Sequence, residues 1–222
     1  MKILIVYWHP EPQSFNGAMF RTACETLTNA GHEVKTSDLH EMRFDPVSGR
    51  KNFTSVKNRD YFKQQIEEMN ATETGGFSEE IEAEMEKIDW CDLMIWQFPL
   101  WWFGLPAALK GWVDRVFAMG RVYGLGHYFE TGVFCGKKAL LSLTTGGPEE
   151  AFNQGGFNGD ISGILRPIQR GILEFVGFSV LAPQIVYGPV RMTNHEREHH
   201  LAAYSKRLRQ IAQESPIDVG TY

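Results

Sequence analysis

The sequence predicts an α/β fold in which five parallel strands form a sheet covered by helices on both faces. Short apolar runs rich in branched residues, beginning with Lys2–Tyr7, are typical of strands buried on both sides. Amphipathic stretches of helical period separate these runs, and right-handed crossovers then place helices on both sides of an open sheet. The 222 residues show neither an internal repeat nor a linker, so we expect one domain over residues 1–222.

The expected elements follow one another along the chain. The strands are expected at Lys2–Tyr7, Glu33–Leu39, Asp92–Phe98, Lys138–Leu143 and Ser179–Tyr187. The first helix should run from Phe15 to about Ala30, with Gly31 as its left-handed cap. A later helix, opened by Pro106 and ending near Gly120, has one apolar face that we assign to the core: Leu109, Trp112, Val113, Val116 and Phe117.

Two segments interrupt this order, at about residues 46–78 and 120–136. The first is polar and contains glycine, and the second is rich in glycine and aromatic residues. Irregular segments of this length are usually binding segments, lids or interface elements.

Composition excludes several classes of protein. With 22 Lys and Arg against 27 Asp and Glu, the net charge of −5 argues against a nucleic-acid-binding face. The three cysteines, Cys24, Cys91 and Cys135, are far apart and form no CxxC, which argues against a disulfide framework or a cysteine-rich metal site. Met1 leads directly into a strand and no apolar run is long enough for a bilayer, so we expect a cytoplasmic protein without a membrane span.

The loops that follow the strands carry the candidate site, because ligands of open parallel sheets bind at the carboxyl ends of the strands. His9, Ser14, Phe15 and Asn16 precede or open a helix, where backbone N–H groups attract anions such as a pyrophosphate. The same residues could instead be an ordinary N-cap. Neither G-x-G-x-x-G nor GxxxxGK[ST] occurs, which argues against a nicotinamide dehydrogenase of the Rossmann type and against a P-loop enzyme.

Aromatic and glycine residues follow the third and fourth strands. The loop from Pro99 to Pro106 contains Trp101, Trp102 and Phe103, which could stack on a planar ring or belong to a core or dimer interface. The turn Thr144–Gly147 offers two hydroxyl groups and then bare backbone, against which a ring can lie closely.

Three blocks of sequence, His9–Met19, Gln97–Phe117 and Lys137–Gly147, closely resemble the FAD-dependent NAD(P)H:quinone reductases of the DT-diaphorase type. Gly159-Asp160 and Pro167–Leu173 extend the match over nearly the whole chain. The resemblance implies a flavodoxin-like fold with strand order 2-1-3-4-5 and a homodimer with two sites at its interface. It also implies FAD rather than FMN as cofactor, and NAD(P)H as reductant in a ping-pong hydride transfer to quinones or related small electrophiles.

The resemblance also assigns residues to the site. The FAD contacts fall on His9, Ser14, Phe15, Asn16, Ala18, Pro99, Leu100, Trp101, Trp102, Phe103, Thr144, Thr145, Gly146 and Gly147. Asp114 matches an acidic residue that reaches the partner's cofactor, and Arg197 matches an arginine near the adenosine end. The substrate pocket is implied to comprise Trp102, Phe103, Gly146, Gly147 and Phe175, with Tyr123 and Tyr128 from the other subunit.

Two positions depart from the family pattern. Hydride transfer to flavin N5 leaves negative charge at the N1–C2=O edge, and the family places Tyr and His there as donors. This chain has Phe152 and Asn158 at those positions. Phe cannot donate a hydrogen bond and Asn cannot take up a proton near neutral pH. We therefore expect either slower reduction of the flavin or a hydride donor other than NAD(P)H. Some relatives use dihydronicotinamide riboside as that hydride donor. The chain also stops soon after its last helix, so we expect it to lack the C-terminal segment with which longer relatives hold the nucleotide.

Two alternatives remain. His195, Glu196 and His199 satisfy H-E-x-x-H, but Thr193 and Glu196 also form a capping box, which gives Glu196 an ordinary structural role; we expect no metal. Some small flavodoxin-like flavoproteins are regulatory or redox-sensing subunits of transporters and other partners, and the sequence leaves that function open.

Overall fold

A parallel sheet organises the chain in the computed structural model, which describes residues 1–221. Its strands are β1 (Lys2–Tyr7), β2 (Glu33–Asp38), β3 (Leu93–Pro99), β4 (Lys138–Thr145), β5 (Ser179–Val180) and β6 (Gln184–Tyr187). All ladders are parallel, and the order β2-β1-β3-β4-β5 is the one expected, with β6 also pairing with β4. Both the fold class and the strand order are therefore confirmed.

The expected last strand, Ser179–Tyr187, is broken into two pieces. Lys138 pairs with Ser179, but Ser142 pairs with Gln184, so the broken strand holds one more residue than β4 between these two pairings. Pro183 stands directly before the second piece and has no N–H to donate to a ladder. Both pieces occupy the predicted place at the edge of the sheet.

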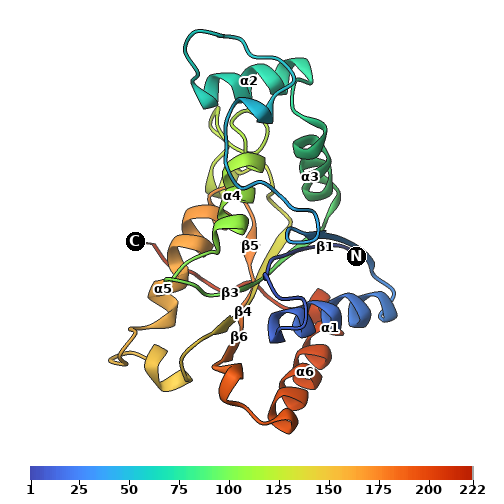
Figure 1. The fold of residues 1–222 in the computed structure, drawn as a ribbon, viewed down its shortest axis with the longest axis vertical. Helices are drawn as coiled ribbons and strands as arrows, with labels where there is room; N and C mark the ends of the chain where they lie inside the picture. Colours follow the sequence, from blue (N-terminus) through green and yellow to red (C-terminus); the bar gives the residue numbers. More distant parts are fainter. Residues whose placement is uncertain (222) are drawn as a thin grey trace.

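Helices cover both faces of the sheet. They are α1 (Phe15–Asn29), α2 (Gln64–Thr74), α3 (Glu79–Trp90), α4 (Ala107–Val116), α5 (Ile161–Ile168) and α6 (Asn194–Leu208). Figure 1 shows α1 and α6 side by side on one side of the sheet. The apolar residues of α3, α4 and α5 belong to the core on the opposite face.

The two cores follow from the alternation of side chains along β1. Leu4 and Val6 enter the core under α3 and α4, whereas Ile3 and Ile5 enter the core under α1 and α6. The predicted apolar face of the fourth helix is buried as expected, with Leu109 and Trp112 fully inaccessible. None of the helices described within residues 1–221 is both long and apolar enough to cross a bilayer.

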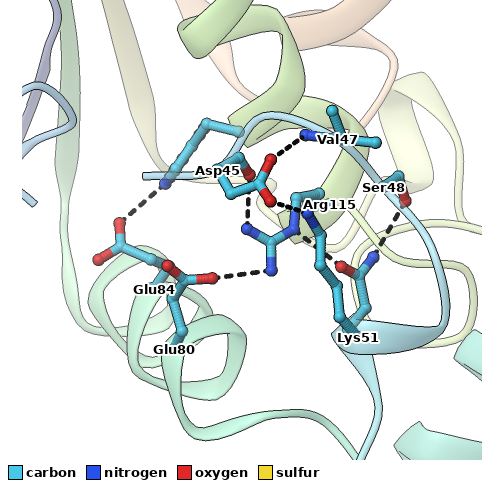
Figure 2. A network of polar contacts seen from close by, with 9 residues as sticks. Asp45, Val47, Ser48, Lys51, Glu80, Glu84 and Arg115 are labelled. Carbon is cyan, nitrogen blue, oxygen red and sulfur yellow. Dashed lines mark hydrogen bonds and ion pairs between the residues drawn. The ribbon is translucent and has the colours of Figure 1, made fainter. Parts of the chain in front are cut away.

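The segment 46–78 is more regular than its composition predicts, because it contains α2. A buried arginine ties the start of this segment to α4 (Figure 2). Arg115 donates through Nε to Asn52 Oδ1 (2.8 Å) and through Nη1 to the Asp45 carbonyl (2.7 Å), and it pairs with Glu80 (2.7 Å). Gly111 of α4 permits the contact, since a Cβ there would lie 2.3 Å from the Pro46 carbonyl oxygen. The segment is thus fixed against the core.

The segment 120–136 is irregular, as expected, and contains one short 3₁₀ turn at Phe129–Thr131. Its aromatic side chains gather around Phe175, with ring centroids 5.9 Å away for Tyr123, 5.2 Å for Tyr128 and 5.4 Å for Phe129. Gly132 packs directly on the backbone at Gly177, since a Cβ on Gly132 would lie 2.5 Å from the Gly177 nitrogen. This segment therefore forms an aromatic cluster with the residues that follow α5.

Candidate functional site

A cavity of about 730 Å³ lies at the carboxyl edge of the sheet. It is bounded by the segments that follow β1, β3 and β4 and by the start of α6. The lining residues are His9, Gln13, Ser14, Phe15, Asn16, Ala18, Pro99, Leu100, Trp101, Thr144, Thr145, Gly146, Pro189, Val190, Asn194, Arg197, Glu198 and Leu201. Twelve of the residues predicted to bind FAD are among them, including Arg197.

The start of α1 offers free N–H groups to this cavity. Ser14 is the N-cap, and its hydroxyl accepts a hydrogen bond from the Gly17 N–H (3.1 Å). Gly17 lets the helix approach the preceding loop, because a Cβ there would lie 2.1 Å from the Pro12 oxygen. Within residues 1–221 the N–H groups of Phe15 and Asn16 have no acceptor. This arrangement suits an anion.

His9 stands beside this helix start. Burial lowers the pKa of the His9 imidazole, and its hydrogen bond with the Glu11 carbonyl partly offsets that effect. In the free protein the ring is therefore mostly neutral at pH 7. A neutral imidazole can still donate one hydrogen bond to a phosphate oxygen.

A buried polar chain lies under the cavity and joins three of its walls. The Asn16 side chain donates to Thr144 Oγ1 (2.7 Å) and accepts from Gln97 Nε2 (2.8 Å). All three residues are buried. The amide side chain of Asn16 is thus engaged within the protein, and its backbone N–H is the group left for a ligand.

The loop after β3 makes a tight turn with two residues in the left-handed region. Trp102 has φ of 51° and Phe103 has φ of 57°, and the turn is closed by paired hydrogen bonds between Trp101 and Gly104 (3.0 and 3.3 Å). Trp101 faces the cavity and packs edge-on against Trp8 at 5.1 Å. Trp102 and Phe103 do not line the cavity, and they are 98% and 53% exposed.

The turn after β4 lies beside both residues that differ from the family pattern, Phe152 and Asn158. A Cβ on Gly147 would lie 3.2 Å from Phe152 Cε2 and 3.4 Å from Asn158 Nδ2. Phe152 and Asn158 therefore both flank the glycine turn. The Phe152 ring is buried and packs against Tyr187, with centroids 5.8 Å apart.

Gly147 lines neither the first cavity nor the second one described below, and Tyr128 lines neither but packs on Phe175, with ring centroids 5.2 Å apart. The other predicted residues form a separate group. Asp114, Tyr123 and Phe175 line a second cavity of about 480 Å³, which shares no lining residue with the first. The Tyr123 hydroxyl contacts Gln65 Nε2 (3.3 Å), and burial raises the pKa of Tyr123. Asp114 pairs with Lys110 at 2.6 Å. A single chain thus does not bring these residues to the cavity containing His9.

Sequence reasoning missed Gln13, two residues of the 3₁₀ turn Pro189–Arg191, and three residues of α6. They are Gln13, Pro189, Val190, Asn194, Glu198 and Leu201. Once Arg197 is placed on a helix, the spacing of three and four residues puts Asn194 and Leu201 on its face, with Glu198 beside it. That signal was available in the sequence.

The H-E-x-x-H motif lies in the first turns of α6. The Glu196 carboxylate accepts hydrogen bonds from the N–H and the hydroxyl of Thr193 (2.7 Å each), which lowers the pKa of Glu196. The capping box is confirmed. In residues 1–221 no cluster of three or more His, Cys, Asp and Glu side chains is arranged to hold a metal ion.

Comparison with known proteins places this geometry in a family. Residues 1–211 match a family model described as having a flavodoxin-like fold. The human ribosyldihydronicotinamide dehydrogenase [quinone] is 42% identical over 217 residues, covering 97% of this chain and 94% of the relative. The guinea pig (Cavia porcellus) NAD(P)H dehydrogenase [quinone] 1 is 43% identical over 217 residues, covering 97% and 79%. Among solved structures, a Klebsiella pneumoniae protein assigned provisionally as a quinone reductase matches with a TM-score of 0.94 and 40% identity, covering 98% of this chain and 87% of that one.

Proposed function

The chain belongs to the flavodoxin-like family of quinone-reducing dehydrogenases, and from this premise we propose that it is an FAD-dependent enzyme that passes two electrons from a dihydronicotinamide to a quinone. The observation that carries the proposal is the cavity at the carboxyl edge of the sheet. An anion-binding helix start, an aromatic wall and a glycine turn all border this one space.

The residues of this cavity suit a flavin. The free N–H groups of Phe15 and Asn16, together with His9, would hold the phosphates. Trp101 would lie along the ring system, and Gly146 would let the ring approach the backbone. The cavity continues along α6 past Arg197 to Leu201, which gives an adenine half a surface and supports FAD over FMN.

A bound flavin would supply hydride transfer at N5 between the dihydronicotinamide and the quinone, a reaction in which negative charge develops on the N1–C2=O edge. The quinone gains two electrons and two protons in total, one proton arriving with the hydride and the other from solvent. The chain's own contribution is orientation and electrostatics. The free N–H groups of Gly146 and Gly147 would donate to that edge, and the Asn158 amide beside Gly147 would add a further donor.

Phe152 removes one donor from that edge. A hydrogen bond to a charged group is worth roughly 1.5 to 3 kcal/mol, which corresponds to about ten- to a hundredfold in rate. The proposed enzyme therefore reduces its flavin more slowly than a relative with both donors, or uses a different reductant. Dihydronicotinamide riboside is a reductant to compare with NADH and NADPH.

We also propose that the working unit is a homodimer. Trp102 and Phe157 are both 98% exposed and Leu125 is 72% exposed, so a second chain has large apolar side chains to cover. Pairing two chains would allow the Tyr123 and Phe175 cluster of one to complete the cavity of the other. The three free cysteines support a reducing, cytoplasmic location.

The test begins with the purified protein. Its absorbance spectrum and mass analysis of the released cofactor should identify FAD, and light scattering should give twice the chain mass. Initial rates with NADH, NADPH or dihydronicotinamide riboside against menadione should give the parallel double-reciprocal lines of a ping-pong reaction. A protein that binds neither FAD nor FMN would overturn the proposal. One that binds FAD but turns over poorly with every donor would favour the regulatory subunit instead.

A further inference from the structure

All three carbonyl oxygens of the turn Thr145–Gly147 are occupied by donors from the protein. Thr145 O accepts from the Gly188 N–H (3.0 Å), Gly146 O accepts from Arg191 Nη1 (2.5 Å), and Gly147 O accepts from Thr145 Oγ1 (2.8 Å). Among residues 1–221 the N–H groups of Gly146 and Gly147 have no acceptor. The turn is therefore fixed through its oxygens, and its two N–H groups remain for a ligand.

The bond from Arg191 acts on one of these N–H groups. The carbonyl of Gly146 and the N–H of Gly147 belong to the same peptide group, so a guanidinium donating to the oxygen makes the N–H a stronger donor. The Gly188 N–H acts in the same way, without a charge, on the peptide that carries the Gly146 N–H. Arg191 is thus the one cation bonded directly to the turn within the described residues.

The local backbone is shaped to bring this arginine back to the turn. Gly188 adopts left-handed angles (φ 57°, ψ 44°), and a Cβ on it would lie 3.2 Å from Arg191 Nη1 and 3.3 Å from Gly147 O. Arg197 holds the next residue, donating through Nε to the Pro189 carbonyl (3.0 Å). In the part of the chain the structure describes, no carboxylate forms an ion pair with Arg191, so its charge is not neutralised.

The two residues flanking Gly147 bring no positive charge to this turn, because the Phe152 side chain has no hydrogen-bond donor and the Asn158 side chain is neutral. We propose that Arg191 is a positioning residue that polarises the Gly146–Gly147 peptide toward the negative charge developing on the flavin's N1–C2=O edge. Through this peptide group, Arg191 supplies part of the stabilisation of negative charge that Phe152 and Asn158 cannot supply. The inference rests on the proposed function, because it requires a flavin at this turn.

The test compares two variants that separate charge from shape. Arg191→Lys keeps the positive charge, whereas Arg191→Gln keeps a neutral donor for Gly146 O. The primary measurement is the two-electron midpoint potential of the bound flavin by dye equilibration. We expect Arg191→Gln to weaken binding of the reduced flavin about tenfold relative to binding of the oxidised flavin. For a two-electron couple this lowers the midpoint potential by about 30 mV. Arg191→Lys should recover most of that shift, and the dissociation constant for oxidised FAD should change less than threefold in either variant.

Arg209→Gln is the matched control, because Arg209 is an exposed arginine at the end of α6, away from the cavity; its potential should equal that of the wild type. Equal potentials for wild type and Arg191→Gln would overturn the inference while leaving the proposed function intact. A lower midpoint potential for Arg191→Lys than for Arg191→Gln would also overturn it, because that order is expected if Arg191 only holds the shape of the turn. If Arg191→Gln fails to retain FAD, Arg191→Lys decides between charge and shape. Loss of FAD from Arg191→Lys as well would show that Arg191 only holds the shape of the turn and would overturn the inference. A wild-type protein without flavin is a failure of the proposed function itself.

Discussion

Substitution of Asn16 tests whether the polar chain under the cavity holds its walls together. Asn16→Ala removes the hydrogen bonds to Gln97 and Thr144 at 2.8 and 2.7 Å. Gln97 Oε1 already lacks a partner, so the variant leaves a buried amide with only the Met19 sulfur, 3.8 Å away. A buried donor or acceptor left unpaired costs about 1 to 3 kcal/mol. We expect the free energy of unfolding to fall by about 2 to 4 kcal/mol.

Urea denaturation of the cofactor-free protein, followed by circular dichroism, measures this loss. Asn29→Ala is the matched control, since Asn29 ends the same helix and is exposed; it should stay within about 0.5 kcal/mol of the wild type. Gln97→Met removes the side-chain amide that Asn16→Ala would leave without a hydrogen-bond partner. The double variant should therefore be more stable than the sum of the two single losses by about 0.5 to 3 kcal/mol. A loss below 1 kcal/mol for Asn16→Ala, or strictly additive losses, would refute the reasoning.

Three further predictions follow from the site and its support. Phe152→Tyr places a hydroxyl beside Gly147 and should speed flavin reduction about tenfold in stopped-flow experiments, and more in the Arg191→Gln background; an unchanged rate in both would show that another donor acts there. Burial lowers the pKa of His9 in the free protein, whereas a bound phosphate favours its cation, so FAD binding should take up a proton and tighten as pH falls from 8 toward 6. Calorimetry in two buffers measures that uptake, which His9→Gln should abolish. Arg115→Met leaves Asn52 Oδ1 and the Asp45 carbonyl without their donor and should cost about 2 to 3 kcal/mol in urea denaturation, with FAD affinity retained; a cost under 1 kcal/mol would mean that the segment 46–78 is held by other contacts.

Much of the fold could be predicted because burial on both faces leaves a strong pattern. The apolar run of β1 has no exposed residue after Lys2, and Gly31 takes the left-handed conformation (φ 82°) expected after α1. Helix α2 was missed for a physical reason. Its buried face includes Glu67 and Glu68, whose carboxylates accept backbone N–H groups from neighbouring segments. A helix that buries carboxylates does not show an apolar stripe.

The site could be predicted as far as the strand-end loops allow. In a parallel sheet the segments after β1, β3 and β4 must meet at one edge, so His9, Trp101 and Thr144 were brought together by topology alone. The support given by Arg191 could not be predicted from local sequence. It depends on the left-handed angles of Gly188 and on the extra residue that the broken strand holds relative to β4, both of which are set by tertiary packing.

The turn after β3 gives an energetic argument for the proposed homodimer. Residues other than glycine in the left-handed region cost about 1 to 3 kcal/mol each, and here Trp102 and Phe103 are adjacent. The paired hydrogen bonds between Trp101 and Gly104 hold that conformation. Within one chain the result is a large side chain held almost wholly in solvent, which stabilises nothing there. A second chain covering Trp102 would recover roughly 1.5 to 3 kcal/mol from burying such a side chain, enough to offset much of the strain. The exposure of Trp102 on this turn is therefore better explained by the proposed partner surface than by folding of the single chain.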